Sequence, residues 1–159
     1  MADICFISVG TLKESYLKDA VAEYKKRLMQ YAKVEEINIS EQTIKNEDDI
    51  SEVRRALDAE GERIIAKIPK ASYIIAMCVE GKEYDSIALA KAIGEAVDLR
   101  GRVTFIIGSS HGLSDNVKNL ADAKISISRL TFPPQLMRVI LIEAVYRSFT
   151  IISGKRYNK

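Results

Sequence analysis

The sequence predicts an α/β domain with a mainly parallel β-sheet. Short apolar runs typical of buried strands alternate along the chain with segments whose apolar residues recur at helical spacing. Such alternation favours right-handed crossovers, which join parallel strands. Loops rich in glycine or proline follow the last two apolar runs, at residues 108–112 and 130–134. Open α/β sheets bind ligands outside the carboxyl ends of their strands, so we expect the functional site at these loops.

The first half of the chain contains two expected strands and two expected helices. Residues 4–9 and 34–39 are the strand-like runs, and Gly10 ends the first of them. Residues 13–31 and residues 48–68 are the amphipathic segments, the second of them highly charged, with a possible break near Gly61. The expected buried faces are Leu17, Ala20, Val21, Tyr24, Leu28 and Tyr31 in the first helix, and Ile50, Val53, Leu57, Ile64 and Ile65 in the second.

The second half repeats the pattern with three strands and three helices. Strands are expected at residues 72–79, at residues 103–107 and around Ile125 and Ile127, with a turn at 80–82. One helix begins at a cap formed by Asp85 or Ser86, and its expected buried face is Leu89, Ala92, Ile93, Ala96 and Val97. A short helix runs from Ser114 to Leu120. The last helix has Pro134 in its first turn, and its apolar residues are Leu136, Val139, Ile140, Val145, Phe149 and Ile152. Residues 1–159 therefore read as a single domain.

Composition excludes several classes of protein. Hydrophobic residues make up 47% of the chain and charged residues 29%, which is typical of a globular domain. The longest apolar run, residues 74–79, is too short to span a bilayer, and Asp3 stands where a signal peptide would carry basic residues, so we expect a cytoplasmic protein without a membrane segment. With one histidine and two cysteines the sequence predicts no metal site, and Cys5 and Cys78 are expected to be buried, reduced thiols.

Charge is distributed unevenly although the net charge is only +2. Residues 35–62 contain ten acidic and three basic side chains, whereas residues 124–159 contain seven basic side chains and one acidic one. This asymmetry favours an anionic partner at the C-terminal face. The alternative is an ordinary mixture of solvated charges.

The two late loops are candidates for binding a nucleotide. The loop Gly108-Ser-Ser-His-Gly112 could bring backbone N–H groups close to a ligand, although an ordinary turn between strand and helix would also use glycine. It lacks both the dinucleotide-binding spacing and the Gly-Lys-Ser/Thr of a phosphate-binding loop. The loop Leu130-Thr-Phe-Pro-Pro134 offers apolar walls and free backbone polar groups, which suit an adenine ring. Its alternative role is to pack over the sheet.

The last helix and the tail suggest partners. Residues 138–147 are apolar on more than one side of the helix, which favours burial in a homodimer interface. The tail, residues 154–159, combines a tyrosine with three cations, a combination that contacts phosphates and stacks on bases in nucleic-acid-binding proteins. A short basic tail can equally be solvated.

Taken together, these segments resemble the RlmH family of the SPOUT superfamily. The resemblance covers the whole chain and is carried by Val9-Gly10-xx-Lys13, Glu23-Tyr24-xx-Arg27, Glu60-Gly61-Glu62, Gly108-xxx-Gly112-Leu113, Leu130-Thr131-Phe132-Pro133, Arg138-Val139, Glu143-xx-Tyr146-Arg147 and Tyr157. Members of this family methylate N3 of a pseudouridine in large-subunit (23S) ribosomal RNA.

The resemblance implies a knotted SPOUT-type α/β domain with a C-terminal trefoil knot, an obligate homodimer and bound S-adenosyl-L-methionine. It also implies that the tail lies at the active site, next to the target base. By position, the cofactor residues would be Met77, Gly108, Ile127, Ser128, Arg129, Leu130, Thr131 and Phe132, and the catalytic residues would be Arg156, Tyr157, Asn158 and Lys159.

Three positions depart from the family pattern. Ser109 stands where a second glycine is usual, Pro134 where a histidine is usual, and Asn158 where the tail usually has a histidine. Asparagine can donate a hydrogen bond to a base carbonyl but cannot take up a proton. The acceptor of the N3 proton therefore stays open between water, Glu143 and His111.

The expected function is methylation of a pseudouridine on the assembled ribosome. A cation such as Arg156 or Lys159 would stabilise the negative charge that develops on the carbonyls flanking N3. Two alternatives remain at this point: an RNA-binding or ribosome-assembly factor with a degraded site, and a SPOUT methyltransferase that acts on transfer RNA.

Overall fold

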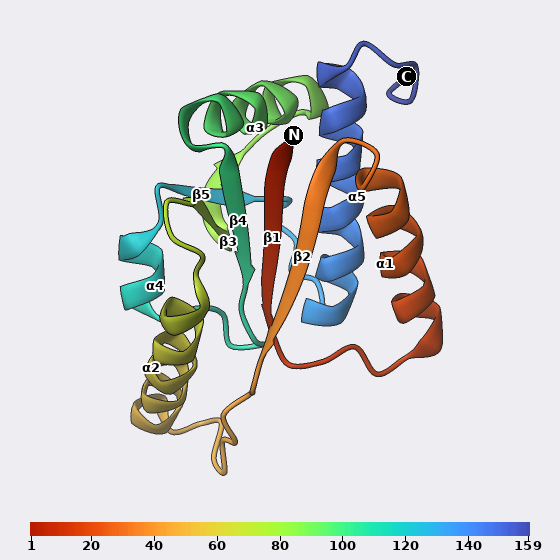
Figure 1. Cartoon of the computed structure of the whole chain (residues 1–159). Coiled ribbons are helices and arrows are strands. Elements are labelled where there is room, and N and C mark those ends of the chain that lie inside the picture. The colour runs from red at the N-terminus through yellow and green to blue at the C-terminus, as the bar shows by residue number, and fades with distance from the viewer.

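The computed structural model describes residues 1–159, which form helices on both faces of a parallel sheet (Figure 1). The strands are β1 (Ala2–Val9), β2 (Ala32–Ile39), β3 (Tyr73–Glu83), β4 (Arg102–Ile107) and β5 (Ala123–Ser126). The helices are α1 (Ser15–Leu28), α2 (Ile50–Lys67), α3 (Ser86–Arg100), α4 (Asp115–Leu120) and α5 (Pro134–Ile152). None of these helices is both long and apolar enough to cross a membrane.

The sheet has five strands in the order β2-β1-β4-β3-β5, and every neighbouring pair is parallel. β4 lies in the middle, and its residues from Val103 to Ile107 are all buried, as expected for a strand covered on both faces. The predicted parallel α/β architecture is therefore confirmed.

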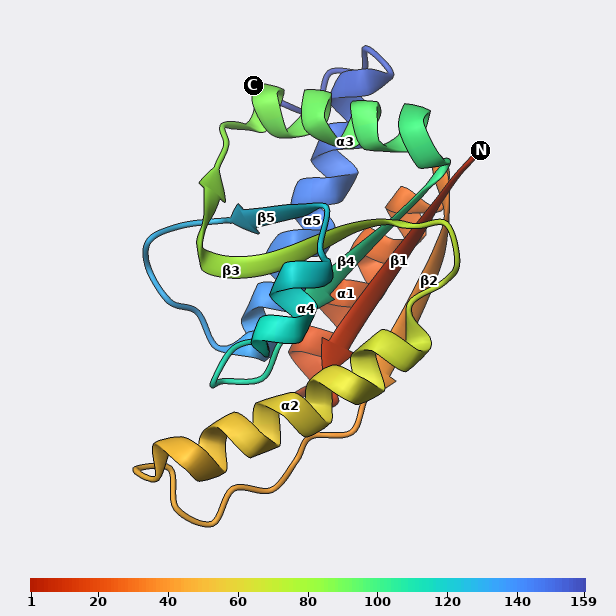
Figure 2. The ribbon, with the colours of Figure 1, turned by 90° about the vertical axis from the view of Figure 1, so that its left-hand side faces the viewer.

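Two hydrophobic cores lie on opposite faces of the sheet. The larger one joins α1, α3 and α5 to the sheet and includes the stacked rings of Phe6 and Phe105, whose centroids are 5.5 Å apart. The smaller one joins α2 and α4 to the other face, through residues such as Ile64 and Val117. Figure 2 shows α2 and α4 in front of the sheet with α1 and α5 behind it.

The order of the strands decides where ligands can bind. The loop after β1 leads to α1 on one face, whereas the loop after the neighbouring β4 leads to α4 on the other. The loops after the neighbouring strands β4 and β3 also lead to opposite faces, to α4 and to α3. Where adjacent parallel strands send their connections to opposite faces, a crevice opens at their carboxyl ends.

The helix α2 differs from its prediction in two respects. It continues through Gly61 without a break, because Gly61 is buried against the start of α4. Its buried face consists of Ala56, Glu60, Gly61 and Ile64, whereas Ile50 is 76% exposed. A buried glutamate is not suggested by an apolar pattern, and here its Oε2 accepts a hydrogen bond from the backbone N–H of Gln42 at 3.0 Å.

Smaller corrections concern the ends of other elements. The expected turn at 80–82 is part of β3, and Ile127 lies beyond the end of β5. Asp85, not Ser86, caps α3 by accepting a hydrogen bond from the N–H of Ala88 at 2.7 Å. In α5, Leu136 and Ile152 are exposed, and the buried residues are Leu141, Ile142, Val145, Ser148, Phe149 and Thr150.

Candidate functional site

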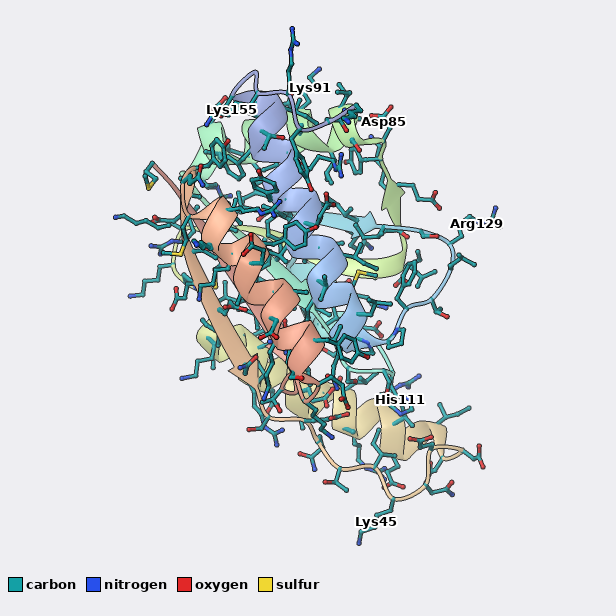
Figure 3. The ribbon with its side chains drawn as sticks, turned by 90° about the vertical axis from the view of Figure 1, so that its right-hand side faces the viewer. Lys45, Asp85, Lys91, His111, Arg129 and Lys155 are labelled. Atoms are coloured by element: carbon teal, nitrogen blue, oxygen red, sulfur yellow. The ribbon has the colours of Figure 1, made fainter.

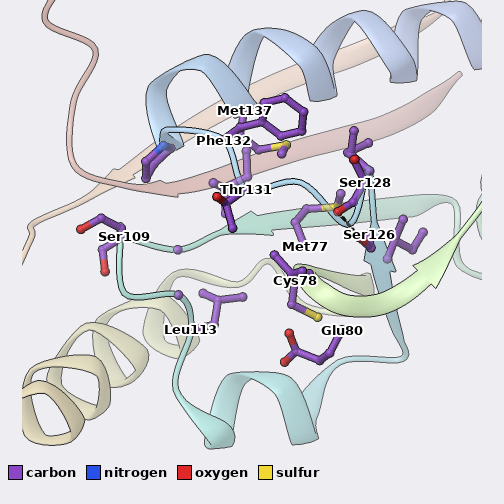
Figure 4. A pocket seen from close by; sticks show the side chains of 18 of the residues that line it. Met77, Cys78, Glu80, Ser109, Leu113, Ser126, Ser128, Thr131, Phe132 and Met137 are labelled. Atoms are coloured by element: carbon purple, nitrogen blue, oxygen red, sulfur yellow. Dashed lines mark hydrogen bonds between the residues drawn. The ribbon is translucent and has the colours of Figure 1, made fainter. Parts of the chain in front are cut away.

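A cavity of about 330 Å³ lies at the carboxyl ends of β4 and β5 and against the middle of β3. Figure 4 shows its walls: Thr131, Phe132 and Met137 lie on one side, and Cys78, Glu80 and Leu113 lie on the other. The loop between β4 and α4 and the loop between β5 and α5 close it. This is the position that both late loops predicted.

The loop after β4 folds back on itself so tightly that it needs glycine. The N–H of Gly112 donates to the carbonyl oxygen of Ser109 at 2.9 Å, and Gly112 has a φ of +92°. A Cβ atom on Gly108 would lie 2.6 Å from the carbonyl carbon of Gly112, which is far inside contact distance. Ser109 does not have a positive φ, so a serine fits where the family usually has glycine.

The loop after β5 is held by hydroxyl groups of its own. Ser126 donates from Oγ to the carbonyl oxygen of Ser128 at 2.8 Å, and Ser128 accepts through Oγ from the N–H of Leu130 at 3.0 Å. These bonds fix the path of the backbone while Thr131 and Phe132 line the cavity. The side chain of Leu130 is 70% exposed and forms part of the rim.

The third wall comes from an irregularity in β3, at the place where the sequence predicted a turn at 80–82 and not a bulge inside a strand. Both Met77 and Lys82 pair with Ile125 of β5, so four residues between them bulge out of the ladder. The backbones approach closely at Gly81, where a Cβ would lie 2.6 Å from the carbonyl carbon of Ile125. The bulge brings Cys78 and Glu80 to the cavity, and the only sequence signal for it is Gly81 inside a strand.

An ion pair was also missed by sequence reasoning. Lys118 of α4 donates from Nζ to Glu80 Oε1 at 2.6 Å, and both residues line the cavity. The lysine lowers the pKa of the Glu80 carboxyl, and the carboxylate raises the pKa of Lys118, so both groups stay charged. Burial, and then the negative charge of Glu80, raises the pKa of the neighbouring Cys78 thiol. Cys78 therefore stays protonated in the cavity wall.

Seven of the eight predicted cofactor residues line this one cavity: Met77, Gly108, Ile127, Ser128, Leu130, Thr131 and Phe132. Arg129 does not line it, and Figure 3 shows its side chain projecting away from the protein. Neighbouring residues of an exposed loop point in different directions, so Arg129 turns outward while Thr131 faces the cavity.

The predicted catalytic tail lies elsewhere in the same chain. The hydroxyl of Tyr157 donates to Glu143 Oε1 at 3.1 Å, and Arg147 donates to Asn158 Oδ1 at 3.1 Å. These contacts hold the tail against the second half of α5, from Glu143 onward, whereas Pro134 and Met137 in its first turn line the cavity. A helix of 19 residues is about 28 Å long. Arg156, Tyr157, Asn158 and Lys159 are therefore not brought to the cavity of their own chain.

The two side-chain candidates for a proton acceptor differ in their positions. Glu143 belongs to the tail cluster, where Arg147 also donates to its Oε1 at 2.6 Å, and it does not line the cavity. His111 does line the cavity, and its Nε2 lies 3.5 Å from Glu47 Oε1 on the loop between β2 and α2. Burial, together with Glu143, raises the pKa of Tyr157 to about 12, so its phenol is a donor near neutral pH. No group of three or more His, Cys, Asp or Glu side chains is arranged to hold a metal ion.

Comparisons with known proteins agree with this geometry. Residues 2–158 match the family model described as "Predicted SPOUT methyltransferase". The ribosomal RNA large subunit methyltransferase H of Streptococcus thermophilus is 46% identical over 155 residues, covering 96% of this chain and 97% of that protein. The protein of the same name from Streptococcus pneumoniae is 44% identical with the same coverage. In fold, the chain is similar to the crystal structure of a tRNA (m1G37) methyltransferase from Aquifex aeolicus, with a TM-score of 0.53, 16% identity, and coverage of 91% of this chain and 69% of that one.

Proposed function

Because the chain belongs to the SPOUT methyltransferase family, we propose that it methylates N3 of a pseudouridine in large-subunit ribosomal RNA. The methyl donor is S-adenosyl-L-methionine, and the substrate is the assembled ribosomal particle in the cytoplasm. The observation that carries this proposal is the single cavity lined by the loops after β4 and β5. The names of the relatives, which act on large-subunit ribosomal RNA, support the choice of substrate.

The cavity fits the proposed cofactor in its chemistry. Leu113, Phe132 and Met137 offer apolar surface for an adenine ring, and the loop backbones offer hydrogen-bonding groups at the rim. The close approach of Gly108 to Gly112 leaves no side chain between the backbone and a ligand. The ion pair of Glu80 and Lys118 provides charged groups for the zwitterionic methionine end. When bound, S-adenosylmethionine supplies an electrophilic methyl group on a sulfonium.

The protein's task in this reaction is to position the base and remove one proton. With the methyl group supplied by bound S-adenosylmethionine, which would be released as S-adenosylhomocysteine, N3 would become methylated as it loses its proton. We assign the proton to water, because His111 is turned toward Glu47 and the Glu143 carboxylate beside the tail already accepts hydrogen bonds from Arg147 and Tyr157. Donors near the carbonyls that flank N3 would stabilise the developing anion.

A second copy of the chain would supply cationic donors of this kind. The tail carries Arg156 and Lys159, both of which are exposed and neither of which lines the cavity of its own chain. We propose a homodimer in which the tail of one protomer reaches the cavity of its partner. The half-buried apolar side chains of α5, including Val139, Ile140 and Ala144, offer a surface for that association.

A methyl-transfer assay tests the proposal directly. Labelled S-adenosylmethionine is supplied with ribosomes that lack the modification, with free ribosomal RNA and with transfer RNA in parallel, and mass spectrometry locates the product. We expect N3-methylpseudouridine in the large subunit of the particle and at most one-tenth as much transfer to either free RNA. Cofactor binding without transfer to any ribosomal substrate would contradict the proposed substrate. Absence of S-adenosylmethionine binding would contradict the proposal that the chain is a methyltransferase.

A further inference from the structure

A second, more polar cleft opens beside the cofactor cavity. It has a volume of about 420 Å³ and lies where the loops after β1, β2 and β4 meet the first turn of α5. Only two of its twelve lining residues are hydrophobic. Its lining residues are Val9, Gly10, Thr11, Lys13, Asn38, Ile39, Ser40, Glu41, Ser109, Ser110, Pro134 and Gln135.

The cleft and the cofactor cavity share a wall. Ser109, Ser110 and Pro134 line both of them. A ligand in the cleft would therefore lie next to the cavity, against the glycine loop and the first residue of α5. Because β1 and β4 are neighbours whose loops leave to opposite faces, the cleft occupies one of the crevices at which open α/β sheets bind ligands.

Three polar side chains of the cleft have a charged or hydrogen-bonding group that can meet a ligand: Lys13, Glu41 and Asn38. Lys13 is exposed and has no carboxylate within 4.0 Å, while its backbone N–H is held by Gln135 Oε1 at 3.0 Å. Glu41 is exposed and makes no ion pair, and its Oε2 would lie 3.7 Å from a Cβ built on Gly10. The side-chain amide of Asn38 is held in one orientation by a hydrogen bond from a neighbouring arginine.

That arginine is Arg138 of α5, which is half-buried and makes no ion pair. It donates to Asn38 Oδ1 at 2.8 Å and to the carbonyl oxygen of Gly10 at 3.3 Å. An arginine can only donate, so the amide oxygen of Asn38 must face it, and the NH₂ group of Asn38 is left to donate elsewhere. On the other side of the cleft, Arg63 holds the carbonyl oxygen of Ser40 at 2.9 Å. The cleft is therefore built from anchored segments.

From this arrangement we infer that the polar cleft binds the target nucleotide of the RNA substrate. This inference rests on the proposed function and names the subsite that would present the base to the cavity. Lys13 contacts the phosphate, Glu41 accepts from the ribose hydroxyls, and the Asn38 amide donates to a carbonyl oxygen of the base. The single cation and single carboxylate match a ribonucleotide, which carries both an anion and hydroxyl donors.

The first test uses uridine 5′-monophosphate as the probe and the full chain labelled for nuclear magnetic resonance. We expect titration shifts at the amides of Thr11, Asn38 and Ser109, and binding at least fivefold weaker in Lys13→Gln. The matched control is Lys91→Gln, because Lys91 is an exposed lysine at the far end of the protein (Figure 3). Shifts confined to other surfaces, or equal binding in both variants, would overturn the inference.

The sugar provides a second comparison in the same experiment. Wild-type protein should bind 2′-deoxyuridine 5′-monophosphate more weakly than the ribonucleotide, and Glu41→Gln should reduce that difference. An unchanged preference in Glu41→Gln would overturn the role of the carboxylate.

The kinetic test separates this inference from the proposed function. Lys13→Gln should raise KM for the ribosomal particle at least fivefold and leave the affinity for S-adenosylmethionine within twofold of wild type, with an unchanged Tm. If wild-type protein transfers methyl groups but Lys13→Gln behaves as Lys91→Gln, the cleft inference fails alone. If uridine 5′-monophosphate binds in the cleft but no ribosomal substrate is methylated, the proposed function fails and the nucleotide site stands.

Discussion

At Gly108 the absence of a side chain decides whether the loop after β4 can close. A Cβ atom there would overlap the backbone of Gly112, and neither backbone segment can move without disturbing the cavity. We expect Gly108→Ala to fold but to bind S-adenosylmethionine at least tenfold more weakly, as measured by calorimetry.

The matched control for this substitution is Gly94→Ala. Gly94 lies within α3, and a Cβ there would be 3.6 Å from the Ile152 side chain, an ordinary contact. Alanine is the better helix former, so this variant should gain up to about 1 kcal/mol of stability and keep its cofactor affinity. Equal cofactor binding by both variants would show that the glycine loop does not shape the site.

The buried thiol of Cys5 makes the stability of the folded protein depend on pH in alkaline solution. It lies in β1 with 2% exposure, and burial, followed by the charge of Glu35, raises its pKa from 9.0 to about 12. The folded state therefore favours the neutral thiol. The contribution of the protonated Cys5 thiol to the free energy of unfolding is fully present below pH 9 and is lost as the pH rises toward 12.

Denaturant unfolding at several pH values measures this effect. Between pH 9 and 10, Cys5→Ala should lose less stability per pH unit than wild type. This window lies below the ordinary pKa of Tyr157, 10.0, whose own upward shift adds a similar loss at higher pH. Parallel curves for the two proteins would contradict the role of Cys5.

At the scale of elements, the contact between α2 and α4 depends on Gly61. A Cβ on Gly61 would lie 3.1 Å from Ser114 Cβ and still closer to Ser114 Oγ, and Ser114 also caps α4. Gly61→Ala gains up to about 1 kcal/mol in helix propensity. Overpacking costs about 1–3 kcal/mol, so the net effect should be destabilising.

Thermal unfolding of a double variant checks the cause. Glycine is tolerated as an N-cap at a cost of a few tenths of a kcal/mol, so Ser114→Gly alone should be mild. Combining it with Gly61→Ala should relieve most of the clash and give a stability above the sum of the single effects. Strict additivity would mean that the two positions do not interact.

The position of the tail leads to a prediction about the whole molecule. If one protomer supplies the cavity and its partner supplies the tail, two different inactive variants can complement each other. Gly108→Ala damages the cavity, and deletion of residues 155–159 removes the tail; neither alone should methylate ribosomes. A mixed dimer of the two contains one intact pair, so co-expression should restore a substantial fraction of activity. Failure to restore any activity would argue that each chain uses its own tail.

Much of this architecture could be predicted from the sequence. Strand and helix periodicities indicated a parallel α/β domain, and Gly108, Gly112 and Pro134 marked the loops that line the cavity. Such signals are local, because a turn or a helix start depends on neighbouring residues. The trefoil knot that the family resemblance implies stays a prediction, since strand order alone does not describe threading.

Other features depend on residues that are distant in the sequence. The bulge in β3 exists because Gly81 meets Ile125, and the charged pair in the cavity exists because α4 lies beside that bulge. The polar cleft likewise needs three strand ends and α5 together. Local periodicity determined the elements and their loops, but only the packing of the sheet decided which side chains meet. Contacts between distant segments depend on strand order and register, which a single sequence does not encode locally.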